Sequence, residues 1–337
     1  MFGLYRILLA LMVVLLHYGG VNYIGEYAVF GFFSLSGYLM TLIMQQNYGY
    51  NIRGIAVYGL NRFLRIYPLY WVACAIASGI LLMVEPNFTT LVNQKFALPN
   101  SIQSWGQNLG LVIGLSTDPV LISPAWALTI ELTFYAAIGL GLSRNKQVTS
   151  IWLAASVIYT AYLLVTDASW IRRYFHILSA TLPFATGAAI YHFRSILLKK
   201  LKFLVVNPIA PILMFTVIIG NWAIGRNFGT ETTWSFYSNY ILCSLMIISL
   251  CKRTRLPFIS RSLDKWLGDL SYPIYLVHFP LSFLFAYTWN KFGFGFGYVW
   301  YTTFLVSLAP LAIISWLMMI CVEQQIEKLR TLVKKTL

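Results

Sequence analysis

Long apolar runs follow one another along nearly the whole chain and are separated by short polar segments. A helix needs about 20 mainly apolar residues to cross a bilayer, and most of the runs come close to that length. The pattern predicts an all-α bundle of about ten membrane-spanning helices. The expected spans are residues 4–23, 27–45, 66–84, 121–142, 150–166, 174–193, 204–224, 234–251, 271–290 and 298–320.

The composition supports this class of protein. Hydrophobic residues make up 59% of the chain and charged residues only 10%, and the mean hydropathy is +0.71. No soluble domain of 337 residues has this composition, so we expect residues 1–337 to form one integral membrane domain. The first run resembles the core of a signal peptide behind Arg6. The segment after it offers no clear cleavage site, so we expect this run to be retained as a span.

The basic residues orient the predicted bundle. With alternating spans, most of the 24 lysines and arginines fall on the side that holds both ends of the chain. Because cytoplasmic loops carry the excess of basic residues, both termini are predicted to be cytoplasmic. The formal charge of +14 then reflects topology and attraction to anionic membrane lipids. The charges are dispersed over several loops, which does not favour a nucleic-acid partner. The few basic residues on the other side are Lys95, Arg172, Arg173, Arg226 and Lys291.

Two ionisable residues lie inside the first span. His17 follows Arg6 by eleven residues, which on an α-helix is three turns plus roughly 20°, with a rise of about 16 Å. Both side chains therefore share one face, with Arg6 near the cytoplasmic end and His17 deep in the membrane. Ionisable groups at such depth are costly unless they face a protein interior, so each is a functional hypothesis. The four cysteines form no CxxC pair, and we expect neither a disulfide nor a metal site.

A pair of arginines precedes the third span. Arg62 and Arg65 lie in the loop before it, three residues apart, and would be neighbours on a helical surface. One interpretation is a topology anchor of the kind that basic residues provide at the cytoplasmic face. The other is a phosphate clamp, because arginine presents a rigid fork of donors that matches phosphate oxygens.

The fourth span carries an acidic residue in mid-membrane. Glu131 lies about ten residues from the outer end, close to the bilayer centre, and His17 reaches a similar depth from the cytoplasmic side. A buried carboxylate and an imidazole at one level can pair, and the carboxylate would then orient the ring. The alternative is that Glu131 only bonds a neighbouring helix. Ser36, Trp126 and Tyr135 are candidates for substrate contact, although small and aromatic residues often serve packing or interfacial anchoring.

The ninth span begins with a polar stripe. Ser271, Tyr275 and His278 are four and three residues apart, so they share one helix face. His278 lies about two turns inside the membrane, where it could line a donor cavity or bond a neighbouring helix. The tail that follows the tenth span, residues 323–330, is expected to be an amphipathic cytoplasmic end with a solvated face.

Taken together and in order, these pieces resemble the acyltransferase type 3 family of integral membrane acyltransferases. The resemblance covers nearly the whole chain, and five pieces in order within a ten-span bundle form a specific signal. The sequence departs from the family pattern at Gly31 and Leu132, where acidic residues are frequent. The matching pieces are Arg6-x10-His17, FFSLSGYL with Ser36, Arg62-x-x-Arg65-Ile-x-Pro68, Trp126-Ala-Leu-x-x-Glu131-x-x-Phe134-Tyr135, and Ser271-Tyr-Pro-x-Tyr275-Leu-x-His278.

The resemblance implies a reaction and its partners. A multi-pass protein of the bacterial inner membrane would transfer an acyl group, commonly acetyl, from cytoplasmic acyl-CoA to a hydroxyl of an extracytoplasmic glycan or lipid-linked sugar. Acyl-CoA would be a donor substrate, and we expect no permanently bound cofactor and no fused extracytoplasmic domain. His17 is the expected general base, supported by Glu131, and direct acylation of His17 stays open. The expected donor-binding residues are Arg6, Arg62, Arg65, Ser271, Tyr275 and His278, and the expected substrate-binding residues are Ser36, Trp126 and Tyr135.

The alternative is a proton-coupled transporter or flippase of a glycolipid or small metabolite. Arg6, His17 and Glu131 would then form a proton relay or a substrate path. No paired spans broken by Gly or Pro recur in corresponding halves of the chain, which disfavours this alternative. A non-catalytic membrane scaffold would not need ionisable groups at matched depth.

Overall fold

The computed structural model describes residues 1–85, 88, 93–114, 117–253, 256, 259–293 and 299–335. These residues form helices and contain no strand, so the all-α prediction is confirmed. The first helices are α1 (Gly3–Gly19), α2 (Ile24–Ile43), α3 (Ile52–Met83), α5 (Ile102–Leu109), α6 (Trp126–Ala137) and α7 (Lys146–Val165). The later helices are α8 (Trp170–Tyr174), α9 (Thr181–Lys200), α10 (Lys202–Val206), α11 (Ala210–Phe228), α12 (Trp234–Leu250), α13 (Arg261–Lys291), α14 (Val299–Met318) and α15 (Gln324–Lys335).

Short π-helical and 3₁₀ segments extend or join several of these helices. The wider π turn and the tighter 3₁₀ turn both rotate the following side chains relative to a continuous α-helix, and π turns frequently occur at functional sites. The π-helical segments are η1 (Met44–Tyr48) after α2, η3 (Ile138–Leu142) after α6, and η6 (Met319–Glu323) between α14 and α15. The 3₁₀ segments are η2 (Ser123–Ala125) and η4 (Ile177–Ala180).

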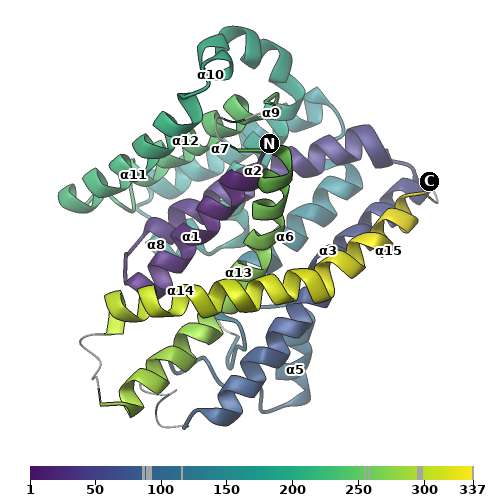
Figure 1. Ribbon diagram of the computed structural model, residues 1–337. Coiled ribbons are helices and arrows are strands. Elements are labelled where there is room, and N and C mark those ends of the chain that lie inside the picture. Colours follow the sequence, from purple (N-terminus) through teal and green to yellow (C-terminus); the bar gives the residue numbers. More distant parts are fainter. Residues whose placement is uncertain are drawn as a thin grey trace.

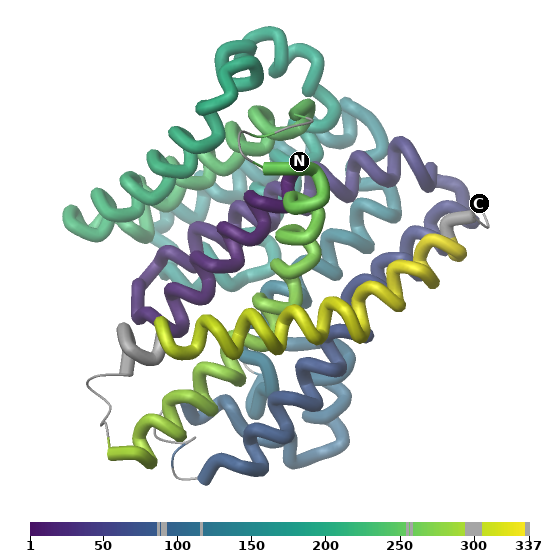
Figure 2. Tube along the Cα trace, viewed as in Figure 1, coloured from purple at the N-terminus to yellow at the C-terminus, as the bar shows by residue number. Residues whose placement is uncertain are grey.

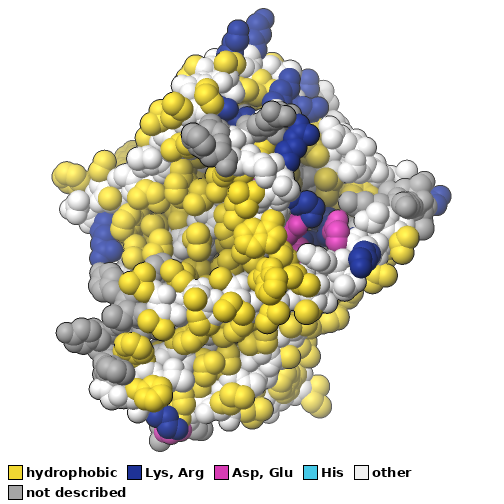
Figure 3. Space-filling model, viewed as in Figure 1, with side chains coloured by type: hydrophobic (Ala, Val, Ile, Leu, Met, Phe, Trp, Pro, Cys, Tyr) yellow, Lys and Arg dark blue, Asp and Glu magenta, His cyan; other side chains and the backbone are white. Residues whose placement is uncertain are grey.

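The helices have the length and composition of a membrane protein. Within the described residues, six are long and apolar enough to cross a bilayer, and α1 and α12 are shorter apolar helices. The count of about ten spans stays a prediction. Figure 3 shows a face covered mainly by hydrophobic side chains, with basic side chains near its edges. On α14, Leu305 and Ile313 are largely exposed, as expected for side chains that face lipid.

The third helix differs from its prediction. Arg62 and Arg65 were expected in a loop, but α3 runs without interruption from Ile52 to Met83 and includes both. Its start is capped by Asn51, whose side-chain oxygen accepts a hydrogen bond from the Gly54 amide at 2.7 Å. The helix therefore begins well before the apolar run. Because they lie inside a helix, the two arginines have fixed directions.

Helices α1 and α2 lie in the middle of the bundle (Figures 1 and 2). In this view α10, α11 and α12 lie on one side of them, and α3 and α5 on the other. The yellow C-terminal helices cross the front, where α14 packs against α13 and α1, and α15 packs along α3. The N-terminal helix α1 and the C-terminal helix α14 are thus in direct contact.

Glycine permits the close approach of α2 and α9. A methyl group built on Gly37 would lie 2.2 Å from the carbonyl oxygen of Phe184, and one on Gly187 would lie 2.0 Å from that of Ser34. Both contacts are with backbone, which cannot move aside as a side chain can. Small residues at such crossings are a common device in membrane helices. Gly37 and Gly187 therefore have a packing role at this crossing.

Substitution of Gly187 by Ala should push α2 and α9 apart. Overpacking of this kind typically destabilises a protein by about 1–3 kcal/mol, so the melting temperature of the detergent-purified protein should fall. Gly220→Ala on α11 is the matched control, because nothing lies within 4 Å of its added methyl group. Equal melting temperatures for the two variants would contradict the close contact.

Candidate functional site

A cavity of about 470 Å³ lies between the N-terminal, central and C-terminal helices. This volume is within the range of small-molecule sites. Helices α1, α2, α3, α6 and α13 line it together with η6 and α15. In Figure 3, acidic and basic side chains meet at a recess between α13 and α15, on a face that is otherwise largely hydrophobic. The charged residues of the lining are Arg6, Arg62, Arg65, Lys265 and Arg330, and Glu131, Asp269, Glu323 and Glu327.

Two of the arginines face the cavity without a counter-ion. Among the described residues, no ion pair joins Arg6 or Arg62 to an acidic group. Arg62 contacts the Met40 sulfur at 3.6 Å and lies over the Tyr58 ring at 5.8 Å, and its Nε is buried without a hydrogen-bond partner among the described residues. A guanidinium in such a place is poised to bind an anion. The structure thus brings together two of the predicted donor-binding residues.

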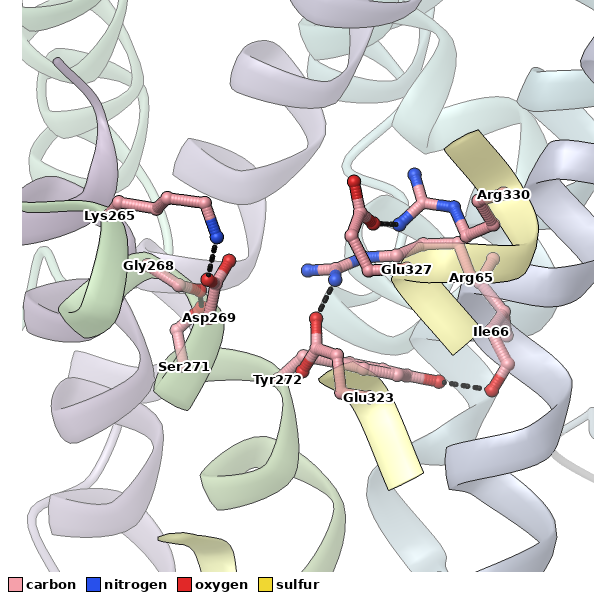
Figure 4. A network of polar contacts seen from close by, with 10 residues as sticks. All are labelled: Arg65, Ile66, Lys265, Gly268, Asp269, Ser271, Tyr272, Glu323, Glu327 and Arg330. Atoms are coloured by element: carbon pink, nitrogen blue, oxygen red, sulfur yellow. Dashed lines mark hydrogen bonds and ion pairs between the residues drawn. The ribbon is translucent and has the colours of Figure 1, made fainter. Parts of the chain in front are cut away.

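The other three cations have acidic partners (Figure 4). Arg65 pairs with Glu323, and the two side chains are only 15% and 10% exposed. Arg330 pairs with Glu327 on its own helix. The Lys265 ammonium lies 2.6 Å from an Asp269 oxygen, but its side chain is 74% exposed. Solvent screens exposed pairs and leaves them worth less than about 1 kcal/mol. The Arg65 pair is the most shielded of the three.

The acidic partners of Arg65 and Arg330 come from the C-terminal segment. Residues 323–330 were expected to form an amphipathic cytoplasmic end with a solvated face, and Glu323, Glu327 and Arg330 of this segment line the cavity. Their spacing of four and three puts them on one helix face. This spacing was visible in the sequence, but the contact of α15 with α3, which turns this face towards the cavity, was not.

A second polar group lies in the cavity wall. Tyr135 Oη donates a hydrogen bond to Glu131 Oε1 at 2.5 Å, and Ser36 Oγ donates to the same oxygen. Tyr58 Oη donates to the Tyr135 carbonyl at 3.2 Å and so ties α3 to α6. Glu131, Ser36 and Tyr135 all line the cavity. The structure therefore unites the predicted acid with two of the predicted substrate-binding residues.

The predicted pair of His17 and Glu131 is not formed. Glu131 is bonded by Ser36 and Tyr135, whereas the partly exposed His17 ring lies 5.1 Å from the ring of His278 and 5.5 Å from that of Phe279. Equal depth placed His17 and Glu131 at one level but could not say on which side of the bundle axis each lies. The partner of His17 is a second imidazole.

His278 is buried completely and oriented by its own helix. Its Nδ1 lies 2.8 Å from the carbonyl oxygen of Tyr275 and 3.2 Å from that of Ile274. Because a carbonyl only accepts, Nδ1 carries the proton, and Nε2 is an unprotonated nitrogen. That Nε2 has no hydrogen-bond partner within the described part of the chain. His278 does not line the cavity, in contrast to the expectation that it would lie in the donor site.

Tyr275 joins the cavity wall to the surroundings of His278. It lines the cavity, and its ring centre lies 6.0 Å from that of His278. Its hydroxyl donates to the Pro124 carbonyl at 2.7 Å, which fixes the ring. Ser271 also lines the cavity and donates to the Gly268 carbonyl at 2.7 Å. Trp126 is apart from the lining, with its ring 4.7 Å from that of Phe175.

The start of α1 is held by α13. One oxygen of Asp264 accepts from the Gly3 amide at 3.1 Å and the other from the Leu4 amide at 3.0 Å. These amides belong to the first turn of the helix, where backbone donors lack partners within the helix itself. Gly3 and Gly268 let the two backbones meet, since a methyl group on Gly268 would lie 2.9 Å from the Gly3 Cα. The clamp directs Arg6 to the cavity.

Comparison with known families decides the class of protein. The sequence profile of a family described as an acyltransferase domain matches residues 3–320, nearly the whole chain. The chain belongs to the acyltransferase type 3 family. No curated protein and no solved structure matches it. As a membrane acyltransferase, the protein needs a donor site and an acceptor site, and the interpretation as a transporter loses its support.

The family motifs divide into two groups in this acyltransferase. The arginines, Ser36, Glu131, Tyr135, Ser271 and Tyr275 line one cavity, and the two histidines lie together, with His278 next to the Tyr275 ring. The roles assigned to these residues stay predictions, and the geometry decides which of them can act on the same ligand.

Substitution of Asp264 by Ala should weaken the clamp on α1. Two amides of the first helical turn would lose their acceptor, which typically costs about 0.5–2 kcal/mol, so the melting temperature should fall. Asp269→Ala, five residues further along α13, removes a carboxylate that pairs with the largely exposed Lys265 and caps no backbone amide, so it should lower the melting temperature less. An equal decrease for both variants would show that the clamp contributes nothing specific.

Proposed function

We propose that this acyltransferase moves an acyl group, in the first instance acetyl, from cytoplasmic acyl-CoA to a hydroxyl of an extracytoplasmic glycan. The acceptor would be a polysaccharide, O-antigen, exopolysaccharide or lipid-linked sugar of a bacterium, and the enzyme would lie in the inner membrane. The observation that carries the proposal is a cavity with two arginines free of acidic partners among the described residues, Arg6 and Arg62.

Acyl-CoA fits both the charge and the lining of the cavity. Its pyrophosphate and ribose phosphate are anions of the kind that the arginine fork binds. The cavity wall is otherwise largely apolar and includes Phe32, Leu39 and Ile43, which suits the long arm that carries the thioester. With the phosphates at the arginines, that arm would extend along α2 towards Ser36, Glu131 and Tyr135.

His17 would act as the general base on the acceptor hydroxyl. The hydroxyl oxygen attacks the thioester carbonyl carbon, the carbon–sulfur bond breaks, the hydroxyl proton passes to His17, and CoA leaves as the thiolate. The buried imidazole of His278 lies beside His17 and restricts its ring. His17 does not line the cavity, so the thioester would have to pass the Tyr275 ring, which lines the cavity next to His278, or the cavity wall would have to move.

Glu131 would orient hydroxyl groups rather than support His17 directly. The same oxygen of Glu131 accepts hydrogen bonds from the Ser36 and Tyr135 hydroxyls. This arrangement brings the two hydroxyls close together in the cavity wall. A carboxylate that accepts two such bonds holds both side chains in one arrangement. The thioester would meet this preorganised surface on its way to His17.

The reaction itself is tested with membranes that contain the protein, labelled acetyl-CoA and surface polysaccharide from the same bacterium. The proposal expects label to enter the polysaccharide only when the donor and the intact protein are both present. Movement of the glycan across the membrane without label would support a transporter and contradict the proposal.

Replacement of His17 by Ala should abolish most of the transfer. General-base assistance typically contributes about 10²–10⁴-fold to a rate, so kcat should fall by at least 100-fold while the protein stays inserted and keeps its melting temperature. Initial rates with purified wild-type and variant protein measure this. A variant that retained near-normal kcat would remove His17 from the mechanism.

Replacement of Arg62 by Gln should weaken donor binding without stopping the chemistry. A hydrogen bond to a charged group is worth about 1.5–3 kcal/mol, which corresponds to a rise of roughly tenfold or more in the donor KM. The control is Arg53→Gln, on the same helix but outside the cavity lining. If both variants kept the wild-type donor KM, Arg62 would be a topology anchor only.

A further inference from the structure

The C-terminal segment contributes charged side chains to the cavity wall. The donor was proposed to bind in this cavity because of residues on other helices. The wide turn of η6 ends at Glu323, and α15 continues with Glu327 and Arg330 on the same face. Figure 4 shows this segment facing α13 and α3, with the Arg65 guanidinium between them. Tyr272 of α13 holds α3 nearby by donating to the Ile66 carbonyl at 2.9 Å. The segment is therefore part of the cavity wall.

The Arg65–Glu323 pair is different from the other pairs in the lining. Both side chains are largely removed from water, and the partners come from helices that are far apart in sequence. The pair of Arg330 and Glu327 lies within one helix, and the side chains of Arg330 and Glu327 are 9% and 46% exposed. Arg330 is thus paired with a carboxylate that solvent screens, whereas Arg65 is paired with one that little water reaches.

We infer that Glu323 is an intramolecular counter-ion that competes with the donor phosphates for Arg65, and that Arg330 is an additional donor-binding residue. This inference rests on the proposed function, because it takes the cavity as the site of a polyphosphate donor. In the empty cavity Glu323 neutralises Arg65. When the donor enters, a phosphate replaces the carboxylate at Arg65, and Arg330 turns from Glu327 to a second phosphate.

The exchange makes the site selective for highly charged donors. A ligand without phosphate offers Arg65 nothing in return for the carboxylate, so the pair stays closed against it. A ligand with several phosphates forms ion pairs with Arg6 and Arg62 as soon as it enters the cavity. It forms a further ion pair with Arg65 when Glu323 separates from that residue. The energy needed to separate Arg65 from Glu323 is subtracted from donor affinity, so removal of the carboxylate must increase that affinity.

The direction in which donor affinity changes when Glu323 is replaced provides the test. Full-length protein purified in detergent is titrated calorimetrically with desulfo-coenzyme A, which carries the donor's phosphates and no thiol. The Glu323→Gln variant should bind this probe at least about fivefold more tightly than the wild type, the lower end of typical coupling between two binding events. Glu323→Asp keeps the competing charge and should stay close to the wild-type Kd. Arg330→Gln should raise the Kd several-fold.

The matched control is Glu85→Gln. It makes the same change of charge at a carboxylate outside the cavity, which accepts a hydrogen bond from Tyr287 at 3.1 Å. Its Kd should equal that of the wild type. An equal gain in affinity for Glu85→Gln and Glu323→Gln would mean that the change in net charge alone causes the gain. That result would overturn the inference.

A double variant keeps the test decisive if Glu323→Gln fails to fold with an unpaired Arg65. In the Arg65→Gln background the further change Glu323→Gln should alter the Kd little, because Glu323 acts through Arg65. A lower Kd in the double variant than in Arg65→Gln would contradict this coupling. If the wild type binds the probe and Glu323→Gln has an unchanged or higher Kd, the inference about Glu323 is refuted, but the proposed donor is not. Absence of binding to the wild type would refute the proposed donor as well.

Discussion

The two hydrogen bonds that the Gly3 and Leu4 amides donate to the Asp264 carboxylate set the positions of Arg6 and His17 on α1. Each residue along an α-helix turns the side-chain direction by about 100°, so a shift of one position would take Arg6 away from the cavity and His17 away from His278. The contact of Gly3 with Gly268 leaves no room for such a shift. One clamp therefore sets the directions of both Arg6 and His17.

Charge balance explains why the C-terminal helix belongs to the site. Five basic side chains around one cavity repel each other, and the cost grows as they leave water. Glu323 and Glu327 reduce this repulsion and hold α15 against the bundle at the same time. A group that stabilises the empty cavity necessarily competes with an anionic ligand for the same cation, so the stability of the empty site and its affinity for a donor are opposed.

The structure separates the two polar groups of the site. Glu131, Ser36 and Tyr135 face the cavity, while His17 and His278 lie together outside its lining. Tyr275 belongs to both neighbourhoods, because it lines the cavity and its ring lies next to that of His278. Its hydroxyl is held by the Pro124 carbonyl, which fixes the ring at this boundary.

The sequence by itself determined the properties that depend on local spacing and composition. The apolar runs specified a helical membrane protein, and the spacing of Arg6 and His17 put both on one face of one helix, α1. Residue counting also placed Ser36 and Glu131 within helices that the structure brings together. These results need only the period of a helix and the thickness of a bilayer.

The tertiary structure decided which of these residues meet. Counting residues gives the depth of a side chain in the membrane but not its direction around the bundle. Depth alone therefore paired His17 with Glu131, whereas the imidazole next to His17 is that of His278. Amphipathic spacing marked the charged face of residues 323–330, but only the packing of α15 along α3 could turn that face from solvent to Arg65. Both outcomes rest on contacts between segments that are far apart in the chain, which no local pattern records.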